Sequence, residues 1–177
     1  MINDYEATKP MTTDAEPVAA AIESNDSVID RLNGLIQVCK DGQYGYKDAA
    51  EGIERPDLKK VFYEFSQQRS EFTGVLQELV RSLGGDPEKA GSIYGAIHRG
   101  WIDIKAAVTG KDEGAILNEC ERGEDFAKEA YADALTAKLP ANVTDIVAQQ
   151  SHAIVAAHNR IKELRNVESH KTATPAN

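Results

Sequence analysis

The sequence has few of the features that mark membrane, nucleic-acid-binding or disulfide-linked proteins. Its 177 residues include only two cysteines, and no apolar stretch approaches the length needed to span a bilayer. The N-terminus has neither a charged segment followed by an apolar core nor a transit-peptide composition. The formal net charge is -9, and no basic run interrupts this acidity. Because such a surface repels phosphates and anionic lipids, we expect a cytoplasmic protein that binds neither nucleic acid nor membrane.

Several catalytic motifs are also missing. The sequence contains no Gly-x-Ser-x-Gly elbow, no phosphate-binding glycine loop that opens a helix, and no Cys-x-x-Cys. Cys39 and Cys120 both fall on or beside apolar helical seams, so we interpret them as small packed thiols rather than ligands or a disulfide. The missing serine elbow and glycine loop exclude serine-hydrolase and kinase-like functions.

The clearest positive signal is one long amphipathic helix over residues 56–83. Its apolar residues recur at alternating intervals of four and three, which is typical of one buried helix face. These positions are Leu58, Phe62, Phe65, Phe72, Leu76, Leu79 and Leu83. Arg69 occupies the position between Phe65 and Phe72 where the pattern calls for an apolar residue. Since a guanidinium stays charged, the pattern predicts an anionic partner for Arg69 from elsewhere in the chain.

The same periodicity predicts three further long helices. The first begins at a cap formed by Ser24, Asn25 or Asp26 and has its seam at Val28, Leu32, Leu35, Cys39, Gly42, Tyr46, Ala49 and Ile53. Another runs from about residue 112 to 137, and the last from a cap at Asn142 or Thr144 to about Asn166. The apolar pattern over residues 92–108 predicts a shorter helix that crosses between the two hairpins. The glycines at 42, 45 and 52 favour the close approach of a neighbouring helix.

These elements predict an all-α fold with one ordered domain. Two hairpins of long helices joined by a crossover give an up-down, long crossover, down-up four-helix bundle with an additional crossover helix. In this topology the long helices over residues 56–83 and 112–137 run parallel. The bundle covers residues 25–166, and we expect flexible tails at residues 1–24 and 167–177.

The hairpin register places ionisable residues near mid-height in the bundle. A turn near residue 55 brings Arg69 level with Asp41, which predicts an Asp41–Arg69 pair. A turn near residue 139 brings Glu121 level with His158. Glu121 and Glu124 have the three-residue spacing that points two carboxylates the same way. We therefore expect a polar layer at the waist of the bundle, because burying such groups without partners is costly.

Two interpretations of this layer remain open. In the first it is a charge network, in which Asp41 or Glu121 neutralises Arg69 and Glu124 holds His158. In the second it is an iron, manganese or zinc site with Glu121, Glu124 and His158 as ligands, assisted by Asp41 or His98. An intact di-iron site requires two Glu-x-x-His pairs, and the sequence contains none. The nearest substitutes are Gln149-x-x-His152 on the last helix and Gln68-x-x-Glu71 on the second.

Three short runs in this order resemble a known family. They are DGQYGYKDAAE at 41–51, HRGW at 98–101 and ERGED at 121–125, with His158 downstream. Together they are similar to a bacterial ferritin-like family catalogued as a domain of unknown function, over residues 25–166. The resemblance implies a ferritin-like bundle with an additional crossover helix and no known reaction, and a stress-related role by analogy with other ferritin-like proteins.

The sequence thus favours a non-enzymatic ferritin-like protein without a cofactor, with a structural polar network and a homodimeric assembly through a helical face. The alternative is a metal-binding oxidoreductase or iron-handling protein with a degenerate carboxylate and histidine site. The partner and the reaction, if there is one, are not predicted.

Overall fold

The computed structural model describes residues 23–89, 101 and 103–173. Within these ranges the secondary structure is helical, with no strand. The helices are α1 (Asn25–Gly52), α2 (Pro56–Ser82), α4 (Ile104–Thr109), α5 (Glu113–Thr136) and α6 (Ala141–Ala173). The predicted N-terminal tail up to residue 22, most of the predicted crossover helix and His98 lie outside the described residues.

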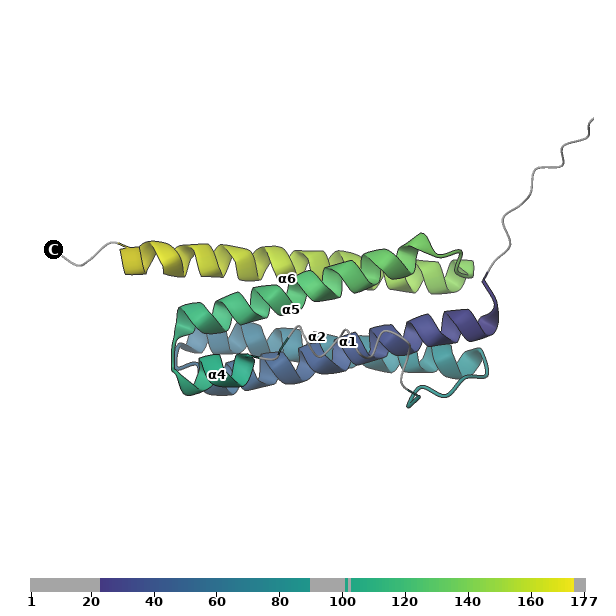
Figure 1. Ribbon diagram of the computed structural model, residues 1–177, viewed down its shortest axis with the longest axis horizontal. Helices are drawn as coiled ribbons and strands as arrows, with labels where there is room; N and C mark the ends of the chain where they lie inside the picture. The colour runs from purple at the N-terminus through teal and green to yellow at the C-terminus, as the bar shows by residue number, and fades with distance from the viewer. Residues whose placement is uncertain (1–22, 90–100, 102, 174–177) are drawn as a thin grey trace, which may run out of the picture.

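The long helices form two antiparallel hairpins that lie lengthwise against each other (Figure 1). α1 packs against α2, and α5 packs against α6; α1 also packs against α5, whereas α2 makes few contacts with α6. Figure 1 shows α2 and α5 running in the same direction. The predicted topology of an up-down, crossover, down-up bundle is confirmed.

Local sequence signals explain where the helices begin and end. Ser24 caps α1 by accepting a hydrogen bond from the Ser27 backbone N–H, and Asp112 caps α5 in the same way. α2 begins at Pro56, a residue suited to the first turn. It ends in a Schellman arrangement, in which Gly84 has a φ of 83° and the Gly85 N–H donates to the Val80 carbonyl at 2.9 Å.

The apolar core divides into two clusters along the length of the bundle. One contains the N-terminal half of α1 and the C-terminal half of α2, with residues such as Leu32 and Leu76. The other contains the opposite ends of these helices, with residues such as Tyr46 and Phe62. Every seam position predicted for the first helix is buried. Because the charged residue Arg69 of α2 is buried between the two clusters, a polar layer does lie at the waist.

One of the predicted close approaches at glycines, that at Gly45, involves Trp101, which also lies against Gly123 of α5. A Cβ atom on Gly45 would lie 2.1 Å from the Trp101 ring, and one on Gly123 would lie 2.4 Å from it. Trp101 therefore packs between α1 and α5 where both helices carry glycine. It lies at a bend, and α4 begins only at Ile104, so the predicted helix over 92–108 does not run unbroken through Trp101.

The last helix is longer than its apolar pattern indicates. α6 continues to Ala173, past Asn166, where the sequence placed its end and the start of a tail. The extension includes Glu168, which is 16% exposed and accepts a hydrogen bond from Arg55 at 2.8 Å. An ion pair, rather than apolar periodicity, thus connects this end of α6 to the α1–α2 turn.

Within the described ranges, no helix combines the length and apolarity that crossing a bilayer requires.

Candidate functional site

The waist of the bundle contains a buried ion pair between two helices. Arg69 of α2 and Glu124 of α5 are each 1% exposed, and Arg69 Nη2 contacts Glu124 Oε1. The Tyr46 hydroxyl donates to the same carboxylate oxygen at 2.6 Å. Gln68 Oε1 accepts a hydrogen bond from Arg69 Nη1 at 2.6 Å. The guanidinium and the carboxylate are therefore paired and hydrogen-bonded, as buried charges require.

The predicted Asp41–Arg69 pair named the wrong carboxylate. The register was close, because a Cβ atom on Gly42, the neighbour of Asp41, would lie 3.3 Å from Arg69 Cγ. The arginine stem thus passes over the bare backbone of α1, and its guanidinium continues across the bundle to Glu124. Asp41 accepts a hydrogen bond from Gln37 on its own helix at 2.8 Å.

The electrostatics of the waist hold the guanidinium charged. Burial alone would lower the pKa of Arg69, but attraction to Glu124, Tyr46 and Cys39 together with the Glu124 hydrogen bond outweighs burial, and the pKa ends above its ordinary value. Burial and the nearby Glu124 charge both raise the pKa of Tyr46, so its phenol stays a hydrogen-bond donor. The Arg69 guanidinium also lies 5.7 Å from the Phe72 ring centroid, within cation–π range.

The second oxygen of the Glu124 carboxylate is left without a hydrogen bond. Glu124 Oε2 is buried and accepts none from the residues that the structure describes. Glu124 also lines a small cavity together with Asp41, Arg69 and Trp101; its volume of ≈ 10 Å³ suits about one water molecule. The waist therefore has space for a solvent molecule beside the ion pair, but not for a second large group.

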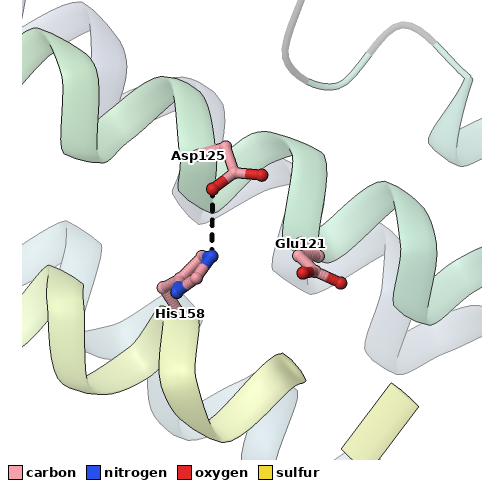
Figure 2. Close-up of side chains that lie close together, drawn as sticks. All are labelled: Glu121, Asp125 and His158. Atoms are coloured by element: carbon pink, nitrogen blue, oxygen red, sulfur yellow. Dashed lines mark ion pairs between the residues drawn. The ribbon is translucent and has the colours of Figure 1, made fainter. Parts of the chain in front are cut away.

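A different group of ionisable side chains lies between α5 and α6 (Figure 2). Glu121 and Asp125 project from α5, and His158 projects from α6 toward them. One ligand atom from each of the three lies within 4.8 Å of the other two. His158 Nε2 is 2.9 Å from Asp125 Oδ1. The side chains of Glu121 and His158 are 11% and 8% exposed, whereas that of Asp125 is 54% exposed, so the group opens to solvent at Asp125.

Two cationic side chains flank this group. Lys128 Nζ lies 3.3 Å from Asp125 Oδ1 and 3.4 Å from His158 Nε2. Arg165 Nη1 lies 2.5 Å from Glu121 Oε2, without the geometry of a hydrogen bond. The two carboxylates are thus balanced by two cations. Two carboxylates and an imidazole form a donor set that suits zinc, iron or manganese.

The structure separates the residues that the sequence placed in one metal site. Glu121 and His158 come together as predicted, but Glu124 contacts Arg69 and Asp125 takes its place beside His158. The expected Glu124–His158 contact and the expected neutralisation of Arg69 by Glu121 are therefore wrong. α5 presents Glu121 and Asp125, four residues apart, toward α6 and presents Glu124 toward α1 and α2. His98 lies outside the described residues.

Sequence reasoning missed two contributors to these sites. Tyr46 was attributed to packing, although it also donates to Glu124. Asp125 was overlooked because it lies off the apolar seam, on the solvent side of α5. Its four-residue spacing from Glu121, which aligns two carboxylates on one helix face, was the signal that could have found it.

The two cysteines are buried and free, as predicted. Cys39 Sγ lies 3.1 Å from the Tyr131 hydroxyl, which donates to Gln150 Oε1 at 2.7 Å. Burial raises the pKa of the Cys39 thiol to about 11. Within the described residues, the group with metal-binding spacing contains no cysteine. Both thiols therefore belong to the packed core.

Comparison with known proteins identifies the class. The chain resembles, with a TM-score of 0.69 and 16% identity, a two-domain protein from Anabaena variabilis that contains DJ-1/ThiJ/PfpI-like and ferritin-like domains. The match covers 89% of this chain and 42% of that one, so this chain spans less than half the length of the Anabaena protein. The fold is a ferritin-like helical bundle. The chain belongs to the family described as domain of unknown function DUF2383, whose model matches residues 27–137. No curated protein matches it.

Proposed function

We propose that this chain is a non-enzymatic ferritin-like protein, in which a buried ion pair occupies the waist in place of a dinuclear metal centre. The observation behind the proposal is the Arg69–Glu124 pair, with both residues 1% exposed. A fixed positive charge at the centre of the bundle disfavours a metal cation there, because like charges repel strongly where the effective dielectric is low.

The ligand chemistry supports the same proposal. A dinuclear centre in this kind of bundle takes a Glu from each of two helices and a Glu-x-x-His pair from each of the other two. This sequence has no Glu-x-x-His pair. Glu124, the carboxylate at the centre, is already engaged by Arg69 and by the Tyr46 hydroxyl. A protein built in this way can bind a partner or stabilise an assembly, but lacks the ligands for ferroxidase chemistry.

Anaerobic loading with Fe²⁺ tests the proposal. We expect fewer than two iron ions per chain by elemental analysis, and Fe²⁺ oxidation in air that is no faster than in protein-free buffer. The Glu124→Gln and Glu129→Gln variants should behave alike in this assay. Both lose one carboxylate of α5, but Glu129 is exposed on the surface and Glu124 lies at the waist.

The opposite result would contradict the proposed function. Two iron ions per chain, with oxidation that disappears in Glu124→Gln and persists in Glu129→Gln, would place a reactive dinuclear centre at the waist. Far-UV circular dichroism of both variants shows whether loss of oxidation follows from loss of a ligand or from unfolding.

The homodimer, the cytoplasmic location and the stress-related role stay predictions from the sequence. A groove between α2 and α6, where these two helices make few contacts with each other, is a surface that a second copy could cover. The groove is lined by Gln68, Glu71, Phe72, Val75, Ile146, Gln149, Gln150 and Ala153. Light scattering of the purified chain would test the assembly.

A further inference from the structure

We propose that Glu121, Asp125 and His158 form a mononuclear site for a divalent transition metal, with Zn²⁺ as the best-suited ion. The site lies between α5 and α6 and shares no ligand with the waist. It goes beyond the proposed function, which concerns the centre of the bundle. The ion would be held by two carboxylates and one imidazole, with solvent free to occupy a further position at exposed Asp125.

The distances fit an ion after side-chain movements. Zinc binds histidine nitrogen and carboxylate oxygen at about 2.0–2.2 Å, so two ligand atoms on one ion lie at most ~4.4 Å apart. The three ligand atoms here lie within 4.8 Å of one another, and His158 Nε2 is 2.9 Å from Asp125 Oδ1. In tetrahedral zinc two ligand atoms lie about 3.4 Å apart, so the side chains would have to close gaps of up to roughly 1.4 Å. Asp125 can move by rotating, because its side chain is 54% exposed.

The hydrogen bonds of His158 orient the imidazole for a cation. His158 Nδ1 lies 3.2 Å from Asn159 Oδ1, and an amide oxygen only accepts, so Nδ1 is the donor. Nε2 faces the Asp125 carboxylate, with 2.9 Å between Nε2 and Oδ1; because a carboxylate only accepts, a proton lies between these atoms, and a metal ion would take the place of that proton. Metal-binding histidines are held in the same way, because their second nitrogen donates to an oxygen outside the ligand set.

A cation already lies at this position. The Lys128 ammonium group is 3.4 Å from His158 Nε2 and 3.3 Å from Asp125 Oδ1, so it contacts two of the three ligand groups at once. The third, Glu121, is nine-tenths buried, and its Oε2 lies 2.5 Å from Arg165 Nη1 without the geometry of a hydrogen bond. A divalent ion would displace the Lys128 ammonium to solvent and gain the Glu121 oxygen.

The donor set also indicates which metals would bind. Imidazole and carboxylate ligands accept zinc, iron and manganese, and zinc binds a given nitrogen and oxygen site more tightly than iron(II) or manganese(II). Arg165 stays close to Glu121 and opposes binding, so we expect a weaker site than a buried structural zinc site. Zinc is therefore the probe, with Co²⁺ as its spectroscopic stand-in.

Isothermal titration of the metal-free full chain with Zn²⁺ tests the proposal. We expect one Zn²⁺ per chain. Binding should weaken at least ~100-fold in His158→Ala and at least ~10-fold in Asp125→Asn, because loss of a ligand costs no less than loss of an outer-shell partner. Lys128→Met should bind more tightly, since it removes the competing ammonium. With Co²⁺, the visible absorption of the bound ion should disappear in His158→Ala.

Two matched variants control for metal bound elsewhere. His152→Ala removes an exposed histidine from the same helix as His158, and Glu129→Gln removes an exposed carboxylate from the same helix as Asp125. Both should bind Zn²⁺ as the parent does. No zinc binding by the parent, or binding that survives both His158→Ala and Asp125→Asn, would overturn the site. So would tighter binding in the parent than in Lys128→Met.

Failure of this site and failure of the proposed function are distinguishable. Zinc binding depends on His158 and not on Glu124, whereas a dinuclear iron centre at the waist would depend on Glu124. Asp125 is exposed, so Asp125→Asn keeps the test informative even if a variant at buried His158 is poorly folded.

Discussion

At the scale of single residues, burial keeps Cys39 as an unreactive thiol. Its side chain is fully buried, with its sulfur beside the Tyr131 hydroxyl. The pKa of the thiol rises from 9.0 to about 11, chiefly because burial disfavours the thiolate. The raised pKa links folding to pH, since the unfolded chain releases this proton before the folded chain does.

The sign of that linkage predicts a pH dependence of stability. The contribution of Cys39 is fully present below pH 9.0 and is lost as the pH rises toward about 11. Between about pH 8 and pH 10 the parent should lose about 1 kcal/mol more unfolding free energy than Cys39→Ala. Urea denaturation of both proteins at the two pH values measures the difference. Equal losses would mean that the thiol titrates normally in the folded chain.

Single residues also show where sequence reasoning stops. Periodicity indicated that Arg69 faces the core and needs an anion, and the hairpin register placed it at the height of Asp41, the neighbour of Gly42. A guanidinium on a long stem can reach carboxylates on more than one helix, and sequence spacing does not distinguish them. The packing of the stem over Gly42 decides the choice, and it leads to Glu124.

At the scale of the helices, the end of α2 depends on a left-handed residue. Gly84 has a φ of 83°, which glycine adopts without strain, whereas Gly74 lies in the exposed middle of α2, where a Cβ would meet nothing within 4 Å. Gly84→Ala should therefore lower the unfolding free energy by about 1 kcal/mol, and Gly74→Ala should raise it by about 0.5–1 kcal/mol.

Thermal or urea unfolding of the two variants beside the parent measures both changes. The substitution is chemically the same in each case, and only the backbone conformation differs. A stabilised Gly84→Ala variant, or a destabilised Gly74→Ala variant, would contradict this explanation of how α2 ends.

Most of the helical framework was predictable because its signals are local. The seam of the first helix, the cap at Ser24 and the start of a long helix near residue 112 were confirmed. The extension of α6 to Ala173 was not predictable from periodicity, because ion pairing of Glu168 with Arg55 of the α1–α2 turn accompanies it. The candidate metal ligand Asp125 was missed for a similar reason. Its role depends on contact with His158 of α6, which periodicity within α5 does not reveal.

At the scale of the whole molecule, the bundle is two apolar clusters joined across a charged waist. Each cluster contains residues from both hairpins, and α1 contacts α5 as well as α2. Arg69 and Glu124 connect α2 to α5, one helix from each hairpin. The ion pair therefore holds the two hairpins at a fixed height relative to each other.

This arrangement accounts for the fold without a metal at its centre. Burying two charges costs several kcal/mol each, and their attraction and added hydrogen bonds offset that cost only while both partners are present. The Tyr46 and Gln68 hydrogen bonds supply part of this compensation. Loss of both charges should consequently cost less than the sum of the two single losses.

A double-mutant cycle on the unfolding free energy of Arg69→Met, Glu124→Gln and the combined variant tests this central claim most directly. Each single variant should lose about 3–5 kcal/mol, because it leaves an uncompensated buried group. The combined variant should be more stable than the sum of the two losses implies, by about 0.5–3 kcal/mol of coupling. Additive losses, or a single variant as stable as the parent, would show that the two charges do not depend on each other and would contradict the account.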